Sequence, residues 1–97
     1  MTHDELRLLP WTGPDGKPCY LSTDSGDGIM SRLANNIEEM QLGMAASLLE
    51  QALPVLADGN ADSESLSLLA AQLADALRDV LRVATSRGHR LVAPESP

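Results

Sequence analysis

The sequence predicts a mostly α-helical fold, an antiparallel two-helix hairpin that carries a small N-terminal β-hairpin. Apolar residues recur with a helical period over residues 28–57 and again over residues 62–87. The connection between these stretches is short, and short connections join antiparallel neighbours. Residues 6–22, which precede both, are punctuated by Pro and Gly in the manner of a β-hairpin. The length, residues 1–97, suits a single domain.

The predicted β-hairpin consists of two short strands around a tight turn. Apolar residues lead into Trp11, the turn Gly13-Pro14-Asp15-Gly16 follows, and Tyr20 lies on the returning strand. A two-stranded ribbon is not stable alone in water, so we expect the helices to support it. Trp11 and Tyr20 either clamp the ribbon onto the helices or form a binding hot spot.

The first predicted helix, residues 28–57, follows a loop rich in helix-capping residues. Asp27 or Ser25 is the expected N-cap. One face of this helix is apolar at spacings of three and four residues: Leu33, Ile37, Met40, Met44 and Leu48. Pro54 should kink the last turn or end the helix near Leu53, because proline lacks the N–H that the helix needs.

The second predicted helix, residues 62–87, has Asp62 as its expected N-cap. Its apolar seam alternates spacings of four and three residues: Leu66, Ala70, Leu73, Leu77, Val80 and Ala84. We expect Gly88 to end the helix at the C′ position, which favours glycine. Residues 92–97 are predicted to form a frayed tail.

The first helix is apolar over more of its surface than one neighbouring helix can cover. A second stripe runs beside the first: Leu42, Ala45, Leu49, Ala52, Leu53 and Leu56. A helix that meets only one other helix needs an apolar stripe of about 100°. Three coverings therefore remain open: the β-hairpin, a second copy of the chain that completes a four-helix bundle, or a different protein. Gly43 would let a neighbouring backbone approach closely.

The charge and the cysteine content narrow the class of partner. A net charge of −7 argues against nucleic acid, because phosphate binding needs several cations on one face. Four arginines near the C-terminus fit a helix end, where the macrodipole favours cations: Arg78, Arg82, Arg87 and Arg90.

The single cysteine excludes an intrachain disulfide. Lacking a signal peptide and an apolar run of about 18 residues, the protein is expected to be cytoplasmic and to bind no membrane.

No catalytic, cofactor or metal site is predicted, so we expect a protein that is not an enzyme. The two histidines, His3 and His89, lie apart, and no zinc-binding spacing is present. Cys19 has no predictable basic neighbour, which favours a small apolar role over a nucleophile. The acidic pairs Glu38-Glu39 and Asp75/Asp79 are expected on solvated helix faces, because acid–base catalysis requires a cleft.

Three segments resemble short uncharacterised actinobacterial proteins. They are Leu-Pro-Trp-Thr-Gly-Pro-Asp-Gly-Lys-Pro-Cys-Tyr-Leu-Ser-Thr-Asp at residues 9–24, Gln41-Leu42-Gly43-Met44, and Ala76-Leu77-Arg78-Asp79. The resemblance covers most of the chain. It implies a cytoplasmic accessory or regulatory protein, and it brings no activity and no functional residue with it.

The sequence thus predicts a non-catalytic protein–protein interaction module, a homodimeric regulatory or accessory subunit. The expected contact stripe is Leu42, Leu49, Leu53 and Leu56, with Met44 and Trp11 as secondary contacts. One alternative is an acidic inhibitor that masks a basic site on a regulator or toxin, since acidic surfaces speed encounter with basic partners. Another is a small-ligand binder with a pocket between the β-hairpin and the helices.

Overall fold

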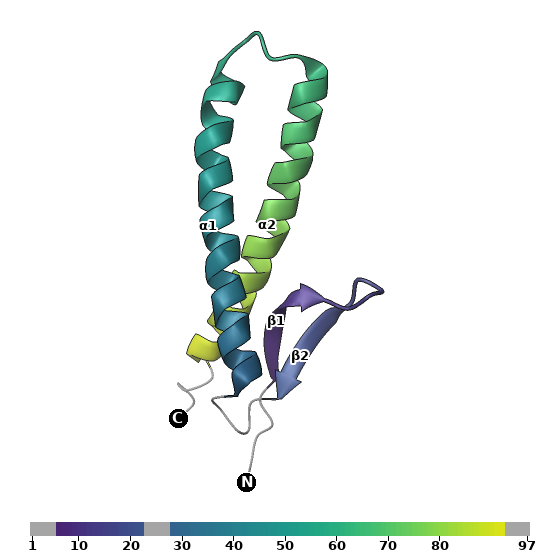
Figure 1. The fold of residues 1–97 in the computed structure, drawn as a ribbon, viewed down its shortest axis with the longest axis vertical. Coiled ribbons are helices and arrows are strands. Elements are labelled where there is room, and N and C mark those ends of the chain that lie inside the picture. Colours follow the sequence, from purple (N-terminus) through teal and green to yellow (C-terminus); the bar gives the residue numbers. More distant parts are fainter. Residues whose placement is uncertain (1–5, 23–27, 93–97) are drawn as a thin grey trace.

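The computed structural model describes residues 6–22 and 28–92, with only the backbone described for residues 89–92. It contains two strands and two helices: β1 (Leu6–Thr12), β2 (Pro18–Ser22), α1 (Ile29–Ala57) and α2 (Ser63–Val92). The two helices run antiparallel, and the two strands form a small antiparallel sheet beside them (Figure 1). The predicted fold class, mostly helical with an N-terminal β-hairpin, is therefore confirmed.

The molecule is strongly elongated. Its principal-axis extents are 61 × 31 × 20 Å, and its radius of gyration is 17.2 Å, against about 12.5 Å for a compact domain of the same length. The β-hairpin packs near the start of α1 and the end of α2, whereas the turn between the helices lies at the far end (Figure 1). We call these two ends the base and the tip.

The seam between the two helices is narrow and is made largely of small side chains. Ala34 and Ala52 of α1 are fully buried, and Leu69 and Val83 of α2 are nearly so. Small residues bring helices close together, but they bury little apolar area. The seam therefore leaves many larger apolar side chains of both helices outside it.

The β-hairpin is irregular where proline interrupts it. Leu6 pairs with Ser22 and Leu8 with Tyr20, and the register then shifts before Thr12. Pro10 lies in the shifted segment, as expected for a residue that cannot donate to the ladder. At the turn, Gly16 has a φ of +80°, which lies in the left-handed region that favours glycine.

The start of α1 differs from the expectation, and its end agrees with the predicted range. The N-cap is Gly28, with no side-chain hydrogen bond, so the prediction of Asp27 or Ser25 as N-cap is wrong. Both of those residues lie outside the described part of the chain. The helix passes through Pro54 and ends at Ala57 instead of near Leu53. Because Pro54 lies in the last turn, its missing N–H removes only one of the final helical hydrogen bonds.

The start of α2 is capped as predicted, whereas its end is not. The Ser65 backbone N–H donates to Asp62 Oδ1 at 2.7 Å, which is N-cap geometry. At the other end the helix continues to Val92, so the prediction that Gly88 terminates it is wrong. Gly88 does not have a positive φ, and a glycine inside a helix weakens it without stopping it. Of the predicted frayed tail, residues 93–97 lie outside the described residues.

Candidate functional site

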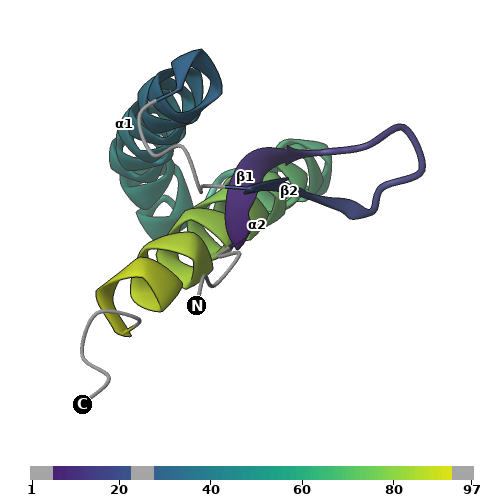
Figure 2. The same ribbon diagram turned by 90° about the horizontal axis from the view of Figure 1, so that it is seen from below.

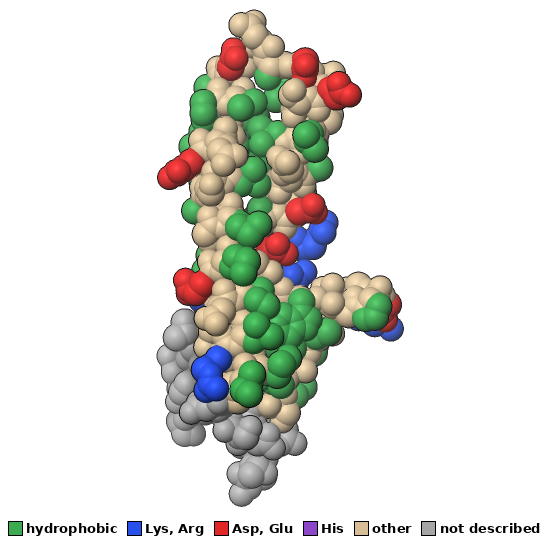
Figure 3. All heavy atoms as spheres, viewed as in Figure 1, with side chains coloured by type: hydrophobic (Ala, Val, Ile, Leu, Met, Phe, Trp, Pro, Cys, Tyr) green, Lys and Arg blue, Asp and Glu red, His purple; other side chains and the backbone are tan. Residues whose placement is uncertain are grey.

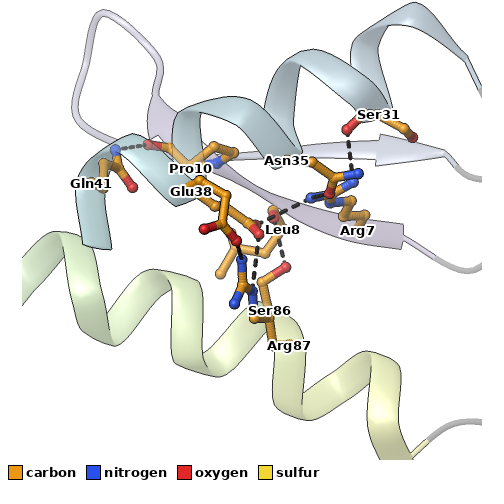
Figure 4. Close-up of polar contacts among 10 residues, drawn as sticks. Arg7, Leu8, Pro10, Ser31, Asn35, Glu38, Gln41, Ser86 and Arg87 are labelled. Carbon is orange, nitrogen blue, oxygen red and sulfur yellow. Dashed lines mark hydrogen bonds and ion pairs between the residues drawn. The ribbon is translucent and has the colours of Figure 1, made fainter. Parts of the chain in front are cut away.

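Hydrogen bonds to backbone carbonyls hold β1 against both helices at the base. The Ser86 hydroxyl of α2 donates to the carbonyl of Leu8 at 3.0 Å (Figure 4). The Gln41 amide of α1 donates to the carbonyl of Pro10 at 2.8 Å. Each bond joins residues at least 31 positions apart in the chain. The position of the β-hairpin is therefore fixed by side chains from both helices.

A buried carboxylate connects all three elements at the base. Glu38 of α1 is fully buried, and its carboxylate lies 3.2 Å from the Arg7 guanidinium of β1 and 3.3 Å from that of Arg87 in α2 (Figure 4). The expectation that Glu38 lies on a solvated face is therefore wrong. A buried charge is tolerated only when it is paired and hydrogen-bonded, and here two arginines pair with it.

Each arginine of this cluster has a further partner. Arg7 donates to the side-chain oxygen of Asn35 at 2.7 Å and to the carbonyl of Ser31 at 3.1 Å. Arg87 lies 3.1 Å from the exposed carboxylate of Glu39, and the hydrogen bond that Arg87 donates to this carboxylate is the main reason that the pKa of Arg87 is raised. Because this cluster joins β1, α1 and α2 through one buried carboxylate, we assign it a structural role.

The β-hairpin does not cover the second apolar stripe of α1. Its contacts with the helices lie at the base, whereas the distal part of the stripe is open. Leu49, Leu53 and Leu56 are 53%, 57% and 55% exposed. Of the three coverings considered, the β-hairpin is therefore excluded for these leucines, and a second copy or a different protein remains.

Leucines of α2 extend this stripe into a two-helix surface. Successive residues of an α-helix are rotated by about 100° around the helix axis. Measured in this way, the leucines of α1 lie about 40–100° around the axis from the buried Ala52. The leucines of α2 lie about 60–120° around their axis, in the same sense, from the buried Leu69. In antiparallel helices the same sense of rotation points to the same face of the hairpin. We call this surface the leucine face; its members are Leu42, Leu49, Leu53, Leu56, Leu66, Leu77 and Leu81.

A groove of about 780 Å³ runs along the opposite face of the hairpin. Its α1 wall includes Met40 and Met44, and its α2 wall includes Gln72, Asp75 and Asp79. Hydrophobic side chains gather along the furrow between the helices in Figure 3. Met44, expected as a secondary contact of the leucine stripe, thus lies on the other flank of α1.

Trp11, the remaining predicted site residue, lies at the base. Trp11 is half-buried in β1, away from the leucine face at the distal end of α1. Asp75 and Asp79 are partly or largely exposed, and each is paired with the arginine three positions on, at 3.3 and 3.2 Å. The groove therefore contains carboxylates that already have cationic neighbours.

The described residues contain no candidate metal site. Among residues 6–22 and 28–88, no three His, Cys, Asp or Glu side chains come together in a way that could hold a metal ion. Cys19 is a half-buried free thiol. No helix in the described part of the chain is long and apolar enough to cross a membrane.

Comparisons with known proteins give no further identification. No family model, no curated protein and no solved structure matches the chain significantly.

Sequence reasoning missed two features of this surface. Leu77, predicted to lie in the seam between the helices, is 58% exposed, and Leu81, which lies outside the predicted seam, is 56% exposed on the same face. The sequence did carry a signal for both leucines, because the apolar arc of α2 is wider than a seam of small residues can bury. Arg7 was also missed, because an arginine that alternates with leucines in a strand is ordinarily expected on the solvated face, whereas Arg7 is buried.

Proposed function

We propose that this protein is a non-catalytic protein–protein interaction module, a homodimeric regulatory or accessory subunit, and that the leucine face is its contact surface. One observation carries the proposal: Leu49, Leu53 and Leu56 are more than half exposed along a single stripe. Scattered exposed leucines need no explanation, but a contiguous apolar surface marks an interaction site. Leu66, Leu77 and Leu81 of α2 lie on the same face and extend that surface onto the second helix.

The elongated shape of the chain supports self-association, because extents of 61 × 31 × 20 Å leave more surface open than a compact monomer of the same length would. Two such hairpins packed through their leucine faces give a four-helix bundle, in which each helix has two neighbours.

Replacing Leu49 by glutamate tests the proposal. A charge on the leucine face should convert the dimer into a monomer in size-exclusion chromatography with light scattering, while the far-ultraviolet circular dichroism keeps its helical signal. Asn36→Glu is the matched control, since Asn36 is exposed on the outer side of α1 and receives the same charge. That variant should remain dimeric.

Two outcomes would count against the proposal. If Leu49→Glu loses its helicity, the stripe belongs to the core of the monomer. If both variants keep the mass of the wild type, the leucine face does not mediate the association. The Asn36→Glu control separates a local effect on the leucine face from a general effect of added charge.

A further inference from the structure

The described methionines lie together on one flank of α1, the flank that faces the groove. Met30, Met40 and Met44 fall within about 80° of one another around the helix axis. They are 43%, 57% and 65% exposed. Met40 and Met44 line the groove one helical turn apart. Two flexible thioethers therefore form part of its α1 wall, on the side of the hairpin away from the leucine face.

Both thioethers are open to solvent in the folded chain. Residues of the two helices line the groove, and no residue of the β-hairpin does. The turn of the β-hairpin points away from both helices, as seen from below in Figure 2. A second copy bound to the leucine face would leave the groove uncovered, because the two surfaces lie on opposite sides. Small oxidants dissolved in water can therefore reach Met40 and Met44.

An exposed thioether reacts with peroxides to give a sulfoxide, which is polar where the thioether is apolar. A hydroperoxide transfers one oxygen atom to the sulfur, so an S–O bond forms as the O–O bond breaks. The proton of the transferred hydroxyl passes to the departing oxygen, which leaves as water or an alcohol. The sulfur is oxidised and the peroxide is reduced. Because the sulfoxide is neutral, it adds no charge beside Asp75 and Asp79 on the opposite wall.

The groove also contains a hydrogen-bond donor suited to a sulfoxide oxygen. Ser47 and Gln51 continue the stripe of Met40 and Met44 at spacings of three and four residues. The Gln51 amide donates to the Ser47 hydroxyl at 3.3 Å. A hydroxyl that accepts one hydrogen bond can also donate one. Ser47 therefore offers a donor one helical turn from Met44, where the sulfoxide oxygen is an acceptor.

We infer that Met40 and Met44 form an oxidation site, at which a hydroperoxide switches the groove from an apolar to a polar surface while the fold is kept. Both side chains are more than half exposed, so their oxidation changes the surface and leaves the buried residues in place. Methionine sulfoxide is returned to methionine by sulfoxide reductases, so the switch is reversible. This role is additional to that of the leucine face.

The other described sulfur atoms lie outside the groove. Met30 is less exposed than Met40 and Met44 and does not line the groove. Cys19 is a half-buried thiol of β2. Oxidation of either side chain should leave the polarity of the groove unchanged, so both provide internal comparisons.

Limited oxidation of the full-length protein by hydrogen peroxide tests the accessibility of the site. Trypsin cleaves after Arg32 and Arg78 and at no position between them, so Met40 and Met44 share one peptide and Met30 lies in another. By mass spectrometry the shared peptide should take up oxygen about as fast in the native protein as after unfolding in urea. A native rate severalfold lower would show that the two sulfur atoms are covered, and would overturn the inference.

The polarity of the groove is measured with Nile red, a neutral dye that fluoresces in apolar surroundings. Peroxide treatment of the Cys19→Ser protein, followed by catalase, should lower the dye fluorescence severalfold. Met40→Leu/Met44→Leu in the same background is the matched control, because leucine keeps the groove apolar and is not oxidised. Its fluorescence should not change, whereas Met30→Leu should lose as much as the parent. Equal losses in the parent and the double variant would overturn the inference.

The fold and the mass give a third readout. After oxidation, circular dichroism should show the same helical signal, and light scattering should show the mass measured before oxidation. A loss of helicity would place the methionines in the core, and a change of mass would place them in a contact between copies. Either result would overturn the inference. The proposed function is tested separately, because Leu49→Glu alters the opposite side of α1 and leaves both methionines in place.

Discussion

Arg7 and Glu38, 31 residues apart in the chain, form an ion pair of 3.2 Å in which both side chains are buried, at 6% and 1% exposure. The pair joins β1 to α1, and Arg87 adds α2 from the other side of the same carboxylate. The elements of the base therefore meet at one charged group. The helical hairpin above it has no comparable buried contact among the described residues and presents its leucines to solvent.

Removing Glu38 should destabilise the fold strongly. Glu38→Ala leaves the buried Arg7 guanidinium without its carboxylate, and breaking a buried pair by removing one partner costs about 3–5 kcal/mol. Urea unfolding followed by circular dichroism measures this. Glu39→Ala is the control, because Glu39 is exposed and its pair with Arg87 is worth less than about 1 kcal/mol. Equal losses for the two variants would contradict the assignment of Glu38 as the centre of the base.

Replacing both members of the pair should be less harmful than replacing one. In Arg7→Met/Glu38→Met no buried charge remains without its opposite, and apolar replacements of buried pairs are often neutral or stabilising. We expect the double variant to be more stable in urea than Glu38→Ala. A double variant less stable than either single one would mean that Arg7 and Glu38 act through separate contacts.

The cap of α2 should give a pH-dependent contribution to stability. Two hydrogen bonds with Ser65 lower the pKa of Asp62 below the ordinary value of 3.8. The bond with the Ser65 side chain is the larger cause, and the bond with its backbone N–H is the second. The stabilisation is therefore present above pH 3.8 and is lost as the pH falls through the folded-state pKa. Asp62→Ala should lower Tm by a few degrees at neutral pH, and the difference from wild type should shrink in acid.

Asp62→Asn is the control for that experiment. Asparagine also caps helices but does not titrate, so this variant should keep most of the Tm at neutral pH. A Tm difference between Asp62→Ala and wild type that stays constant down to pH 3 would contradict a role for the carboxylate charge.

Gly43→Ala should stabilise the protein. Gly43 lies inside α1, and a Cβ added there meets no atom within 4 Å. Replacing a glycine inside a helix by alanine contributes about 0.5–1 kcal/mol, measurable by urea unfolding. Gly16→Ala should have the opposite effect, because Gly16 has a φ of +80°. Since Gly43 lies on the side of α1 away from the leucine face, the Kd of the dimer should not change; a weaker dimer would mean that a second backbone packs at Gly43.

Much of the fold could be predicted because it depends on local patterns. Helical periodicity located both helices, and Asp62 marked the start of α2. The N-cap at Gly28 was missed because it uses no side-chain bond, so no residue type signals it. The continuation of α2 beyond Gly88 was missed for a related reason. Glycine ends a helix only where the chain turns into a left-handed conformation, and the sequence does not specify that turn.

The candidate site was only partly predictable, because its α1 leucines and its α2 leucines depend on different information. The stripe from Leu42 to Leu56 follows from the period of one helix. The contribution of Leu77 and Leu81 depends on how narrow the seam is, which is a property of both helices together. The burial of Glu38 depends on Arg7, which comes from a strand that no local pattern places against α1.

We expect the leucine face to be covered by a second copy of the chain. Light scattering across a dilution series of the wild-type protein tests it most directly. A dimer gives a mass of twice 10.3 kDa that persists well below micromolar concentration and falls to the monomer mass only at high dilution. A mass of 10.3 kDa at every concentration, with full helicity, would contradict it.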